Sequence, residues 1–361
     1  MAMTVDQLMQ GAMDRNASDI HLKEGNPPIF RIDGALVRIE GEPALTEDDL
    51  QEMLKEVASP ADIAKFQKVM ELDNSYFYEG KARFRINVCK DDGDTRIVMR
   101  LIPLTILTIE ELQLPPVLKK LCVLKNGLVL VTGPTGSGKS TTLAGLINDI
   151  NTNRPDHIIT VEDPVEFLHR DKMAIVTQRE IGHDTLSFAN ALRGALRQDP
   201  DVILIGEMRD AETVRTALAS AETGHLVFST LHTVDAVETL NRVIDFFEPH
   251  QQIQIRKQLA SVLRGVVSQR IVPLATGSGR CVAAEILLGT RTVRDFIEKG
   301  KAFKDIVQLV EEGNDQYGMQ TFDQALFILY KEGRITAEIA LANATSAKDL
   351  KLRMQGMGKG G

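Results

Sequence analysis

The sequence of 361 residues has no tryptophan, four tyrosines and three cysteines. Cys89, Cys122 and Cys281 lie far apart without a C-x-x-C pair, which gives no basis for a disulfide framework or a four-cysteine zinc site. No apolar run approaches the roughly 20 residues of a membrane-spanning helix, and residues 1–15 lack the pattern of a signal peptide. These absences favour a cytoplasmic protein with reduced thiols, whose membrane association would be peripheral.

The bulk composition is that of an ordinary globular protein. Hydrophobic residues make up 43% and charged residues 25%, and the length suffices for two or three domains. The net charge is -8 at pH 7. An acidic balance counts against a large nucleic-acid interface, which would favour a basic face.

A glycine-rich segment that fits the pattern G-x-x-x-x-G-K-[ST] in full organises the chain. The apolar residues 128–131 before it predict a buried strand, and residues 141–150 after it predict a helix. This is the strand–loop–helix context of a phosphate-binding loop. The loop consists of Gly133, Pro134, Thr135, Gly136, Ser137, Gly138, Lys139, Ser140 and Thr141.

The chemistry of this loop suits a nucleoside triphosphate. Its glycines let the backbone turn tightly and aim N–H groups inward, and the next helix adds the positive end of its dipole. Lys139 can reach the β- and γ-phosphates, and Ser140 can offer its hydroxyl to Mg²⁺. The loop alone does not indicate how the energy of the triphosphate is used.

The first hundred residues predict a small α+β domain. Thr46 is expected to cap a helix whose first turn is acidic. Residues 101–116, which contain three prolines, predict a linker. The helices are expected at residues 4–16 and 46–57, and the strands at residues 19–22, 29–34, 75–78, 82–88 and 96–101.

From about residue 117 to residue 355, short apolar runs alternate with longer helical patterns. This alternation predicts an α/β domain with a mainly parallel sheet covered by helices, and residues 356–361 predict a disordered tail. Strands are expected at residues 128–131, 158–161, 202–205, 226–228 and 283–288. Further helices are expected at residues 186–197, 211–222, 293–297, 322–332 and 337–343.

Polar residues follow several of these strands directly. Because ligands bind at the carboxyl ends of parallel strands, these groups are expected to converge with the loop at one edge of the sheet. Glu207, after four apolar residues and a glycine, is assigned to the magnesium shell. Either Glu162 or Glu166 positions the attacking water, and the residues alone do not choose between them. His232 is a candidate γ-phosphate sensor or a contact to a neighbouring subunit. The alternative for Glu166 is an ordinary surface-loop acid, and the alternative for His232 is a hydrogen-bonded histidine without a role in the site.

Together, these motifs resemble those of the secretion-superfamily ATPases, and the similarity covers nearly the whole chain. Residues 133–141, 162–166, 206–210 and 223–225 with 230–233 resemble the Walker A, Asp box, Walker B and His box. Residues 18–22 and 82–87 resemble the N-terminal domain of that family, and residues 318–323 resemble the tail of its PilT/PilU branch, the type IV pilus retraction ATPases.

The resemblance implies a homohexameric ring at the inner face of the inner membrane. Each subunit would have a PAS-like N-terminal domain and a RecA-like P-loop NTPase domain, with ATP and Mg²⁺ bound between them. The family also implies that Arg83, Arg85 and Arg100 serve the nucleotide, since guanidinium groups stabilise charge on the γ-phosphate. Arg96 is expected to make only surface pairs. The implied partners are an inner-membrane pilus platform protein and, indirectly, pilin.

Two features refine the branch. Extension motors and type II secretion ATPases usually have a longer N-terminal region and often a tetracysteine motif, and the absence of both favours retraction. Retraction motors carry a helix of approximate sequence A-I-R-N-L-I-R-E, which residues 292–299 match only in part, at Arg294 and Ile297.

The sequence therefore predicts a hexameric ATPase that drives pilus retraction and twitching motility. An accessory PilU-like motor and a nucleotide-gated scaffold with little hydrolysis remain alternatives, although the intact set of acids counts against the scaffold. A nucleic-acid translocase is the third alternative, and the acidic balance and the pilus-type motifs count against it.

Overall fold

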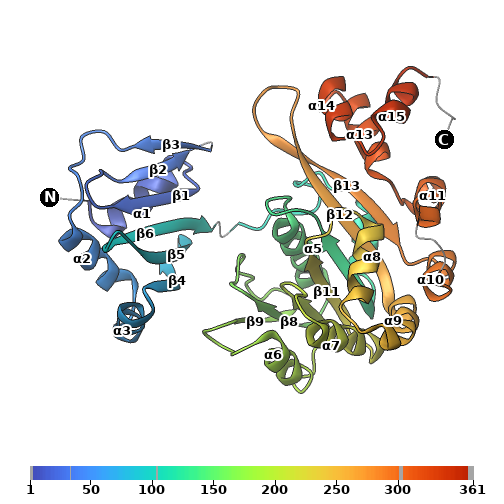
Figure 1. The fold of residues 1–361 in the computed structure, drawn as a ribbon, viewed down its shortest axis with the longest axis horizontal. Coiled ribbons are helices and arrows are strands. Elements are labelled where there is room, and N and C mark those ends of the chain that lie inside the picture. The colour runs from blue at the N-terminus through green and yellow to red at the C-terminus, as the bar shows by residue number, and fades with distance from the viewer. Residues whose placement is uncertain (1–2, 33, 103–104, 301–303, 357–361) are drawn as a thin grey trace. The chain divides into compact units, whose positions relative to one another are not determined.

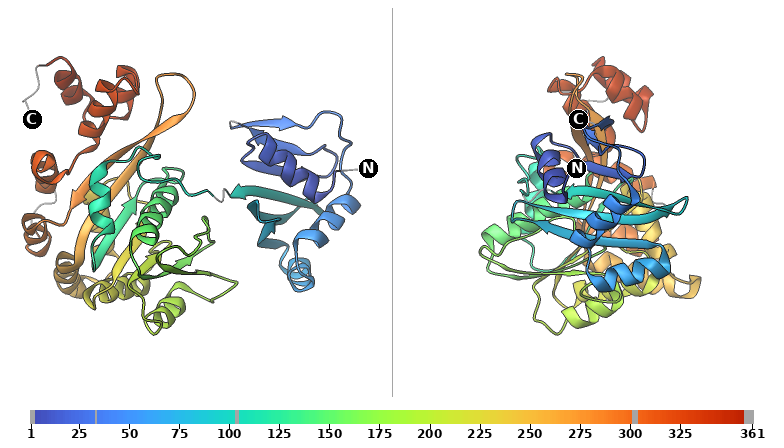
Figure 2. Two further views of the ribbon diagram at one scale, coloured as in Figure 1. Left: turned by 180° about the vertical axis from the view of Figure 1, so that it is seen from behind. Right: turned by 90° about the vertical axis from the view of Figure 1, so that its left-hand side faces the viewer.

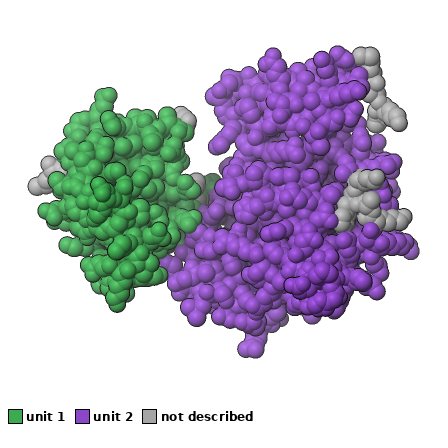
Figure 3. All heavy atoms as spheres, in the orientation of Figure 1, with its two compact units in different colours: residues 1–105 green, residues 106–361 purple. Residues whose placement is uncertain are grey.

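The computed structural model describes residues 3–32, 34–102, 105–300 and 304–356 (Figure 1). The chain divides into two compact units, residues 1–105 and residues 106–361 (Figure 3). Residues 103–104 of the expected linker and residues 357–361 of the expected tail lie outside the described residues. No helix among the described residues is long and apolar enough to cross a membrane.

The first unit is an α+β structure with one antiparallel sheet of strand order β3-β2-β1-β6-β5-β4. Thr46 caps α2 in a reciprocal capping box with Asp49, as the sequence predicts. Helix α3 and strand β3 were not predicted. The elements are α1 (Val5–Asp14), β1 (Asp19–Lys23), β2 (Ile29–Ile32), β3 (Ala35–Arg38), α2 (Glu47–Val57), α3 (Pro60–Val69), β4 (Glu71–Tyr78), β5 (Ala82–Asp91) and β6 (Asp94–Ile102).

Alternation along β5 separates the core from the outer face of this sheet. Phe84 and Ile86 are fully buried, while Arg83 and Arg85, which alternate with them, point the other way and are half-buried. The pairing register places Arg85 opposite Arg100 of β6. Like charges directly opposite each other on a sheet face are destabilising, so packing alone does not explain this pair.

The second unit is built on a seven-stranded sheet of order β13-β12-β7-β11-β10-β8-β9 (Figures 1 and 2). All neighbours are parallel except β12 and β13, which confirms the mainly parallel sheet. Strands β9 and β12 were not predicted. The strands are β7 (Gly127–Thr132), β8 (His157–Glu162), β9 (Ile175–Glu180), β10 (Val202–Ile205), β11 (Leu226–Leu231), β12 (Leu263–Pro273) and β13 (Arg280–Leu288).

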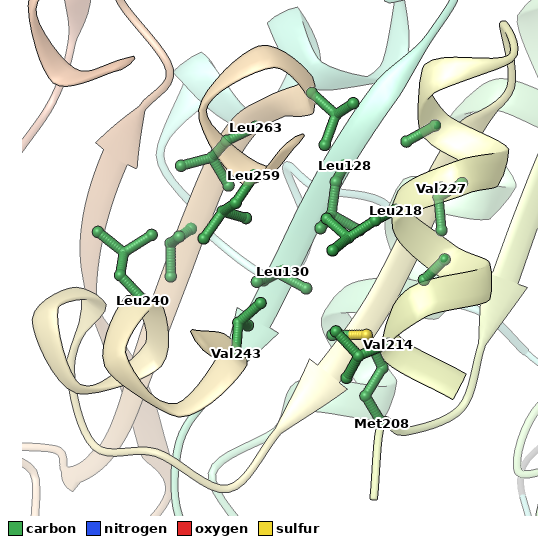
Figure 4. Packing of buried hydrophobic residues seen from close by; sticks show 14 of the residues in the cluster. Leu128, Leu130, Met208, Val214, Leu218, Val227, Leu240, Val243, Leu259 and Leu263 are labelled. Atoms are coloured by element: carbon green, nitrogen blue, oxygen red, sulfur yellow. The ribbon is translucent and has the colours of Figure 1, made fainter. Parts of the chain in front are cut away.

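Helices cover both faces of this sheet, so its central strands are apolar on both sides. Leu128 and Leu130 of β7 pack among side chains of α7, α8 and α9 (Figure 4). Val129 and Val131 pack on the other face against α4 and α5. The helices up to residue 262 are η1 (Pro116–Leu118, a 3-10 helix), α4 (Lys119–Cys122), α5 (Lys139–Asn153), α6 (Phe188–Ala195), α7 (Ala211–Glu222), α8 (Ala236–Asp245) and α9 (Pro249–Val262).

The expected linker overlaps structured parts of both units. Strand β6 continues through Ile102, and Ile109 and Leu114 are buried in the core of the second unit. At the other end of the chain, α13 packs on β13, α14 packs on β12, and α15 packs on these two helices, and together with the two strands they bury a small separate cluster. The C-terminal helices are α10 (Arg291–Glu298), α11 (Lys304–Glu312), α12 (Asn314–Tyr317), α13 (Phe322–Lys331), α14 (Ala337–Asn343) and α15 (Ala347–Met354).

Candidate nucleotide-binding site

The glycine-rich loop joins the end of β7 to the start of α5. Gly133 has a φ of 141°, and a Cβ there would lie 2.5 Å from both the Gln269 carbonyl oxygen and the Ser137 hydroxyl. Gly138 has a φ of 86° and precedes the first helical residue, Lys139. Side chains are therefore excluded at positions where the backbone turns most tightly, which leaves room for an anion beside the N-terminus of α5.

The remaining loop residues divide between solvent and core. Pro134, Thr135 and Gly136 are exposed, and Ser137 is buried. Ser140 and Thr141 lie half-buried in the first turn of α5. Ser140 thus has the exposure that a hydroxyl ligand of Mg²⁺ requires.

Lys139 folds back over the loop. Its Nζ donates hydrogen bonds to the carbonyl oxygens of Gly133, at 2.8 Å, and Pro134, at 3.1 Å. Burial lowers the pKa of Lys139, while the nearby carboxylate of Glu166 opposes this shift. The ammonium group is thus held at the loop by weak neutral acceptors, which a phosphate would replace by charge-assisted bonds.

The carboxyl ends of β10 and β11 are tied together beside the loop. The Thr230 hydroxyl donates to the Gly206 carbonyl oxygen at 2.6 Å, and the Met208 N–H donates to the Thr230 carbonyl oxygen at 3.1 Å. A Cβ on Gly206 would approach the Cα of Glu162 to 3.2 Å, so glycine permits the close passage of the Glu162 backbone. The acids that follow β8 and β10 are therefore neighbours, as the strand pattern predicts.

Glu207 is the centre of a charged group at this edge. Its carboxylate forms an ion pair with Arg209 and lies 3.0 Å from Nε2 of His232. Arg209 also approaches Asp163, at 3.4 Å. The side chain of Glu207 is 14% exposed and that of His232 is 57% exposed. Burial, with the charges of Lys139 and Arg209, lowers the pKa of His232, which favours the neutral imidazole.

The two acids of the Asp box differ in their surroundings. Glu162 accepts hydrogen bonds from the Thr160 hydroxyl, at 2.7 Å, and from the Gln178 amide, at 3.3 Å. Burial raises its pKa to about 7. Glu166 is exposed and lies close enough to Lys139 to act on its pKa. A carboxylate that orients water must be accessible, and the exposed Glu166 meets this condition better than Glu162.

Strand β9 supplies residues that the sequence analysis missed. The Gln178 side chain donates to the Phe167 carbonyl oxygen and accepts from the His169 N–H, both at 2.8 Å. The Glu180 carboxylate accepts from the Val165 N–H at 3.1 Å. These bonds hold the loop that carries Glu162 and Glu166. The alternation of residues 175–180 was a weak signal because polar residues predominate there.

The two parts of the motif likened to a His box lie at opposite ends of β11. His232 follows the strand at the edge that carries the loop, whereas residues 223–225 precede it. The ring of His225 contacts the Ser220 carbonyl oxygen at 2.8 Å and the Thr223 hydroxyl at 3.2 Å. These contacts give His225 a structural place in the turn after α7.

The predicted arginines belong to the first unit. Arg100 donates to Asp19 at 2.8 Å, Arg83 donates to the Ser75 hydroxyl at 2.8 Å, and Arg85 lies 3.8 Å from Asp73. Arg100 remains 65% exposed despite its pair. All three lie on one outer face of the sheet, because Arg83 and Arg85 alternate with core residues and Arg100 is the cross-strand neighbour of Arg85.

A phosphate loop after β7, with acids at the carboxyl ends of β8 and β10 in the same mainly parallel sheet, defines a P-loop protein with a RecA-like core. Over residues 1–325 the sequence matches the family described as Type II/IV secretion system protein. The chain belongs to this family.

Two relatives and one solved structure are similar over nearly the whole chain. The type IV pilus retractation ATPase PilT of Pseudomonas aeruginosa is 42% identical over 342 residues, which cover 95% of this chain and 98% of that protein. The type IV pilus ATPase PilU of the same organism is 40% identical over 353 residues, 98% of this chain and 92% of that protein. A crystal structure of the pilus retraction motor PilT with bound ADP superposes with a TM-score of 0.89 at 44% identity and covers 97% of this chain and 99% of that one.

Proposed function

We propose that this chain is an ATP-hydrolysing motor of type IV pilus retraction. The observation that carries the proposal is the meeting of the phosphate loop, Glu207 and His232 at one edge of the sheet. The similarity to a pilus retractation ATPase over 95% of the chain supports the process that the site would drive. The motor would act as a homohexamer at the inner face of the inner membrane, on a platform protein and through it on pilin.

The loop provides the binding site for the triphosphate. Backbone N–H groups of residues 133–141 and the N-terminus of α5 bind the phosphates. Lys139 releases the carbonyl oxygens of Gly133 and Pro134 and donates to phosphate oxygens instead. The exposed Pro134 and Thr135 leave this face of the loop open to the substrate.

Ser140 and Glu207 fit a magnesium ion, which is held by oxygen ligands. The Ser140 hydroxyl lies in the first turn of α5. The Glu207 carboxylate is partly buried beside His232, and the neutral imidazole of His232 does not neutralise the negative charge of the carboxylate. A bound Mg²⁺ would neutralise negative charge on the phosphate oxygens. Arg209 would then keep its second acidic partner, Asp163.

Glu166 orients the attacking water in this proposal, and Glu162 holds the loop that carries Glu166. Glu162 is engaged by Thr160, Gln178 and the Glu166 N–H, the last at 3.5 Å, so it fixes the loop from which Glu166 projects. His232 reports the state of the phosphates through its contact with Glu207. Arg83, Arg85 and Arg100 contribute guanidinium groups that stabilise charge on the γ-phosphate.

An accessory motor of the PilU kind is the second candidate. The near full-length similarity to PilU, at 40% identity, favours it almost equally. The phosphate site would be the same in both cases. The difference would lie in whether the ring retracts pili alone or only beside another motor.

Deletion of the gene in its own host tests the proposal. We expect loss of twitching motility with pili still on the cell surface, restored by the wild-type gene but not by Lys139→Ala. Normal twitching and normal pilus number after deletion would contradict a role in retraction. A deletion that weakens twitching without abolishing it, and a Lys139→Ala gene that restores it, would identify the accessory motor.

A further inference from the structure

Four buried hydroxyl groups from four different segments meet beneath the phosphate loop. The Thr239 hydroxyl of α8 lies 2.7 Å from that of Thr233 and 3.3 Å from that of Thr132. The Thr132 hydroxyl lies 2.9 Å from that of Ser268 on β12. Thr132, Thr239 and Ser268 are fully buried and Thr233 is 5% exposed. The group therefore forms a continuous polar chain inside an apolar core.

The register of the sheet explains why this chain touches the functional segments. Thr132 is the last residue of β7, directly before Gly133, and it pairs with Leu231 of β11 on one side and Ser268 on the other. Leu231 directly precedes His232, and Thr233 directly follows it. The hydroxyl chain thus connects the base of the phosphate loop with the segment that carries His232.

Thr239 is the member that joins the two segments. Besides Thr233 and Thr132, its hydroxyl donates to the Asp235 carbonyl oxygen at 2.6 Å. A hydroxyl has one proton, so Thr239 donates either to the Asp235 carbonyl oxygen or to the Thr132 hydroxyl, and it can accept from the Thr233 hydroxyl in both cases. Removing it would leave the buried Thr233 hydroxyl without this hydrogen bond, which carries a free-energy penalty, whereas Thr132 would keep Ser268 and the Asp235 carbonyl oxygen would keep the Thr239 N–H.

The start of α8 is fixed independently of Thr239. The Glu285 carboxylate on β13 accepts the Ala236 N–H at 2.7 Å, and the Asp235 side chain caps the helix through the Glu238 N–H, also at 2.7 Å. The helix would therefore remain in place without the Thr239 hydroxyl. What would be lost is the tie between Thr233 and Thr132.

We propose that Thr239 is a positioning residue: its buried hydroxyl holds the segment of His232 and Thr233 against the base of the phosphate loop, and so keeps His232 beside Glu207 during turnover. The effect of Thr239 on turnover depends on the function proposed for His232, but its effect on the position of His232 does not. Thr239 itself does not touch the substrate, because it is fully buried behind the loop.

The variants follow from the contacts. Thr239→Val removes the hydroxyl at nearly constant volume, and Thr239→Ser retains it. The matched control is Ser220→Ala, because Ser220 is also fully buried and donates to the carbonyl oxygen four residues earlier, at 2.8 Å, but has no contact with the hydroxyl chain. Thermal unfolding identifies any variant that does not fold, and only folded variants enter the comparison.

The first experiment measures steady-state ATP hydrolysis by the full chain. We expect Thr239→Val to lower kcat by about fivefold to tenfold, no more than His232→Ala, with KM for ATP within twofold, and Thr239→Ser and Ser220→Ala to remain within twofold of wild type. In a His232→Ala background, Thr239→Val should change kcat less than twofold, because the residue it positions is absent. An equal loss of kcat in both backgrounds, or no loss in either, would overturn the proposal.

The second experiment tests position without turnover. Modification of each histidine by diethyl pyrocarbonate is followed by mass spectrometry, with the exposed His183 as internal reference. We expect the rate at His232 relative to His183 to change at least threefold in Thr239→Val and to stay unchanged in Ser220→Ala. An unchanged ratio in Thr239→Val would overturn the proposal even if ATP hydrolysis falls. A changed ratio with no ATP hydrolysis in the wild type would support the positioning and contradict only the proposed function.

Discussion

Nε2 of His232 lies 3.0 Å from Oε2 of Glu207, and this contact joins the ends of two neighbouring parallel strands. Glu207 follows β10 and His232 follows β11, so each side chain arrives at the site on its own rigid strand. The lowered pKa of His232 favours the neutral ring. A neutral ring can donate a hydrogen bond to the Glu207 carboxylate and leaves the negative charge of that carboxylate available to a metal ion. The pair therefore connects the acid proposed to hold Mg²⁺ to the residue proposed to respond to the phosphates.

Replacing either member of this pair should lower turnover by different amounts. We expect Glu207→Gln to reduce kcat by roughly 100-fold or more, since it would remove the carboxylate proposed to bind Mg²⁺. His232→Ala should cost about tenfold, because it removes one hydrogen bond to Glu207. Steady-state ATP hydrolysis over a range of Mg²⁺ concentrations checks both. A Glu207→Gln variant with the turnover and Mg²⁺ requirement of wild type would show that the metal is held elsewhere.

Substitution of the two acids of the Asp box, Glu162 and Glu166, should lower kcat by different amounts. Glu166→Gln removes the accessible carboxylate and is expected to lower kcat by about 10² to 10⁴-fold with ATP binding retained. Glu162→Gln should lower kcat less, because an amide oxygen can still accept from Thr160. Single-turnover hydrolysis together with ATP titration measures both steps. The reverse order of the two losses would assign the water to Glu162 instead.

The arginines of the first unit can be tested against a neighbour on the same sheet. Arg85→Ala and Arg100→Ala should each lower ATP turnover at least tenfold, if these two side chains serve the nucleotide as proposed. Arg96→Ala is the matched control, because Arg96 also lies on β6 and its acidic partner, Asp91, is 3.8 Å away on the surface. Equal activity of all three variants would restrict Arg85 and Arg100 to their pairs with Asp73 and Asp19.

Stability should fall as the pH rises through the titration of Glu285. Burial raises its pKa to about 7, against opposing effects of the Ala236 N–H and Arg270 and additional repulsion from Asp235 and Asp323. A raised carboxyl pKa means that the folded state favours the protonated acid, so the stabilisation is complete below about pH 4.5 and is lost towards pH 7. The difference corresponds to roughly 3 kcal/mol of unfolding free energy at most.

Glu285→Gln mimics the protonated acid and retains an acceptor for the Ala236 N–H. Relative to wild type, its melting temperature should be unchanged near pH 4.5 and several degrees higher at pH 8. The exposed Glu298→Gln is the control and should follow wild type at both pH values. A Glu285→Gln variant that is less stable at pH 8 would show that the ionised carboxylate stabilises the fold. Glu162 adds the same pH trend and is unaffected by this substitution.

The central strands of the second unit could be predicted because they are buried on both faces. Residues 202–205 are apolar without interruption, and β10 has these bounds. Helices α7 and α14 also have the predicted bounds, with side-chain caps at Asp210 and Thr336. Where local pattern and burial agree, the sequence is a sufficient guide.

Strands at the margin of the sheet could not be predicted in the same way. In β9 only Glu180 is buried, so the strand lacks an apolar signature although it positions the Asp box through Gln178. The choice between Glu162 and Glu166 likewise depends on burial, which the spacing of the motif does not contain. The hydroxyl chain around Thr239 depends on strand register, which only the tertiary structure shows.

The most direct test of the account is steady-state ATP hydrolysis by the purified chain, titrated in protein concentration and compared with Lys139→Ala. We predict turnover in the wild type that rises per subunit as the ring assembles, or is constant if assembly is already complete, and that vanishes in Lys139→Ala. A mass measurement at the same concentrations distinguishes these two forms of the expected result. Wild-type turnover no greater than that of Lys139→Ala, with ATP still bound, would contradict an autonomous motor and favour a scaffold or an accessory that needs a partner ATPase.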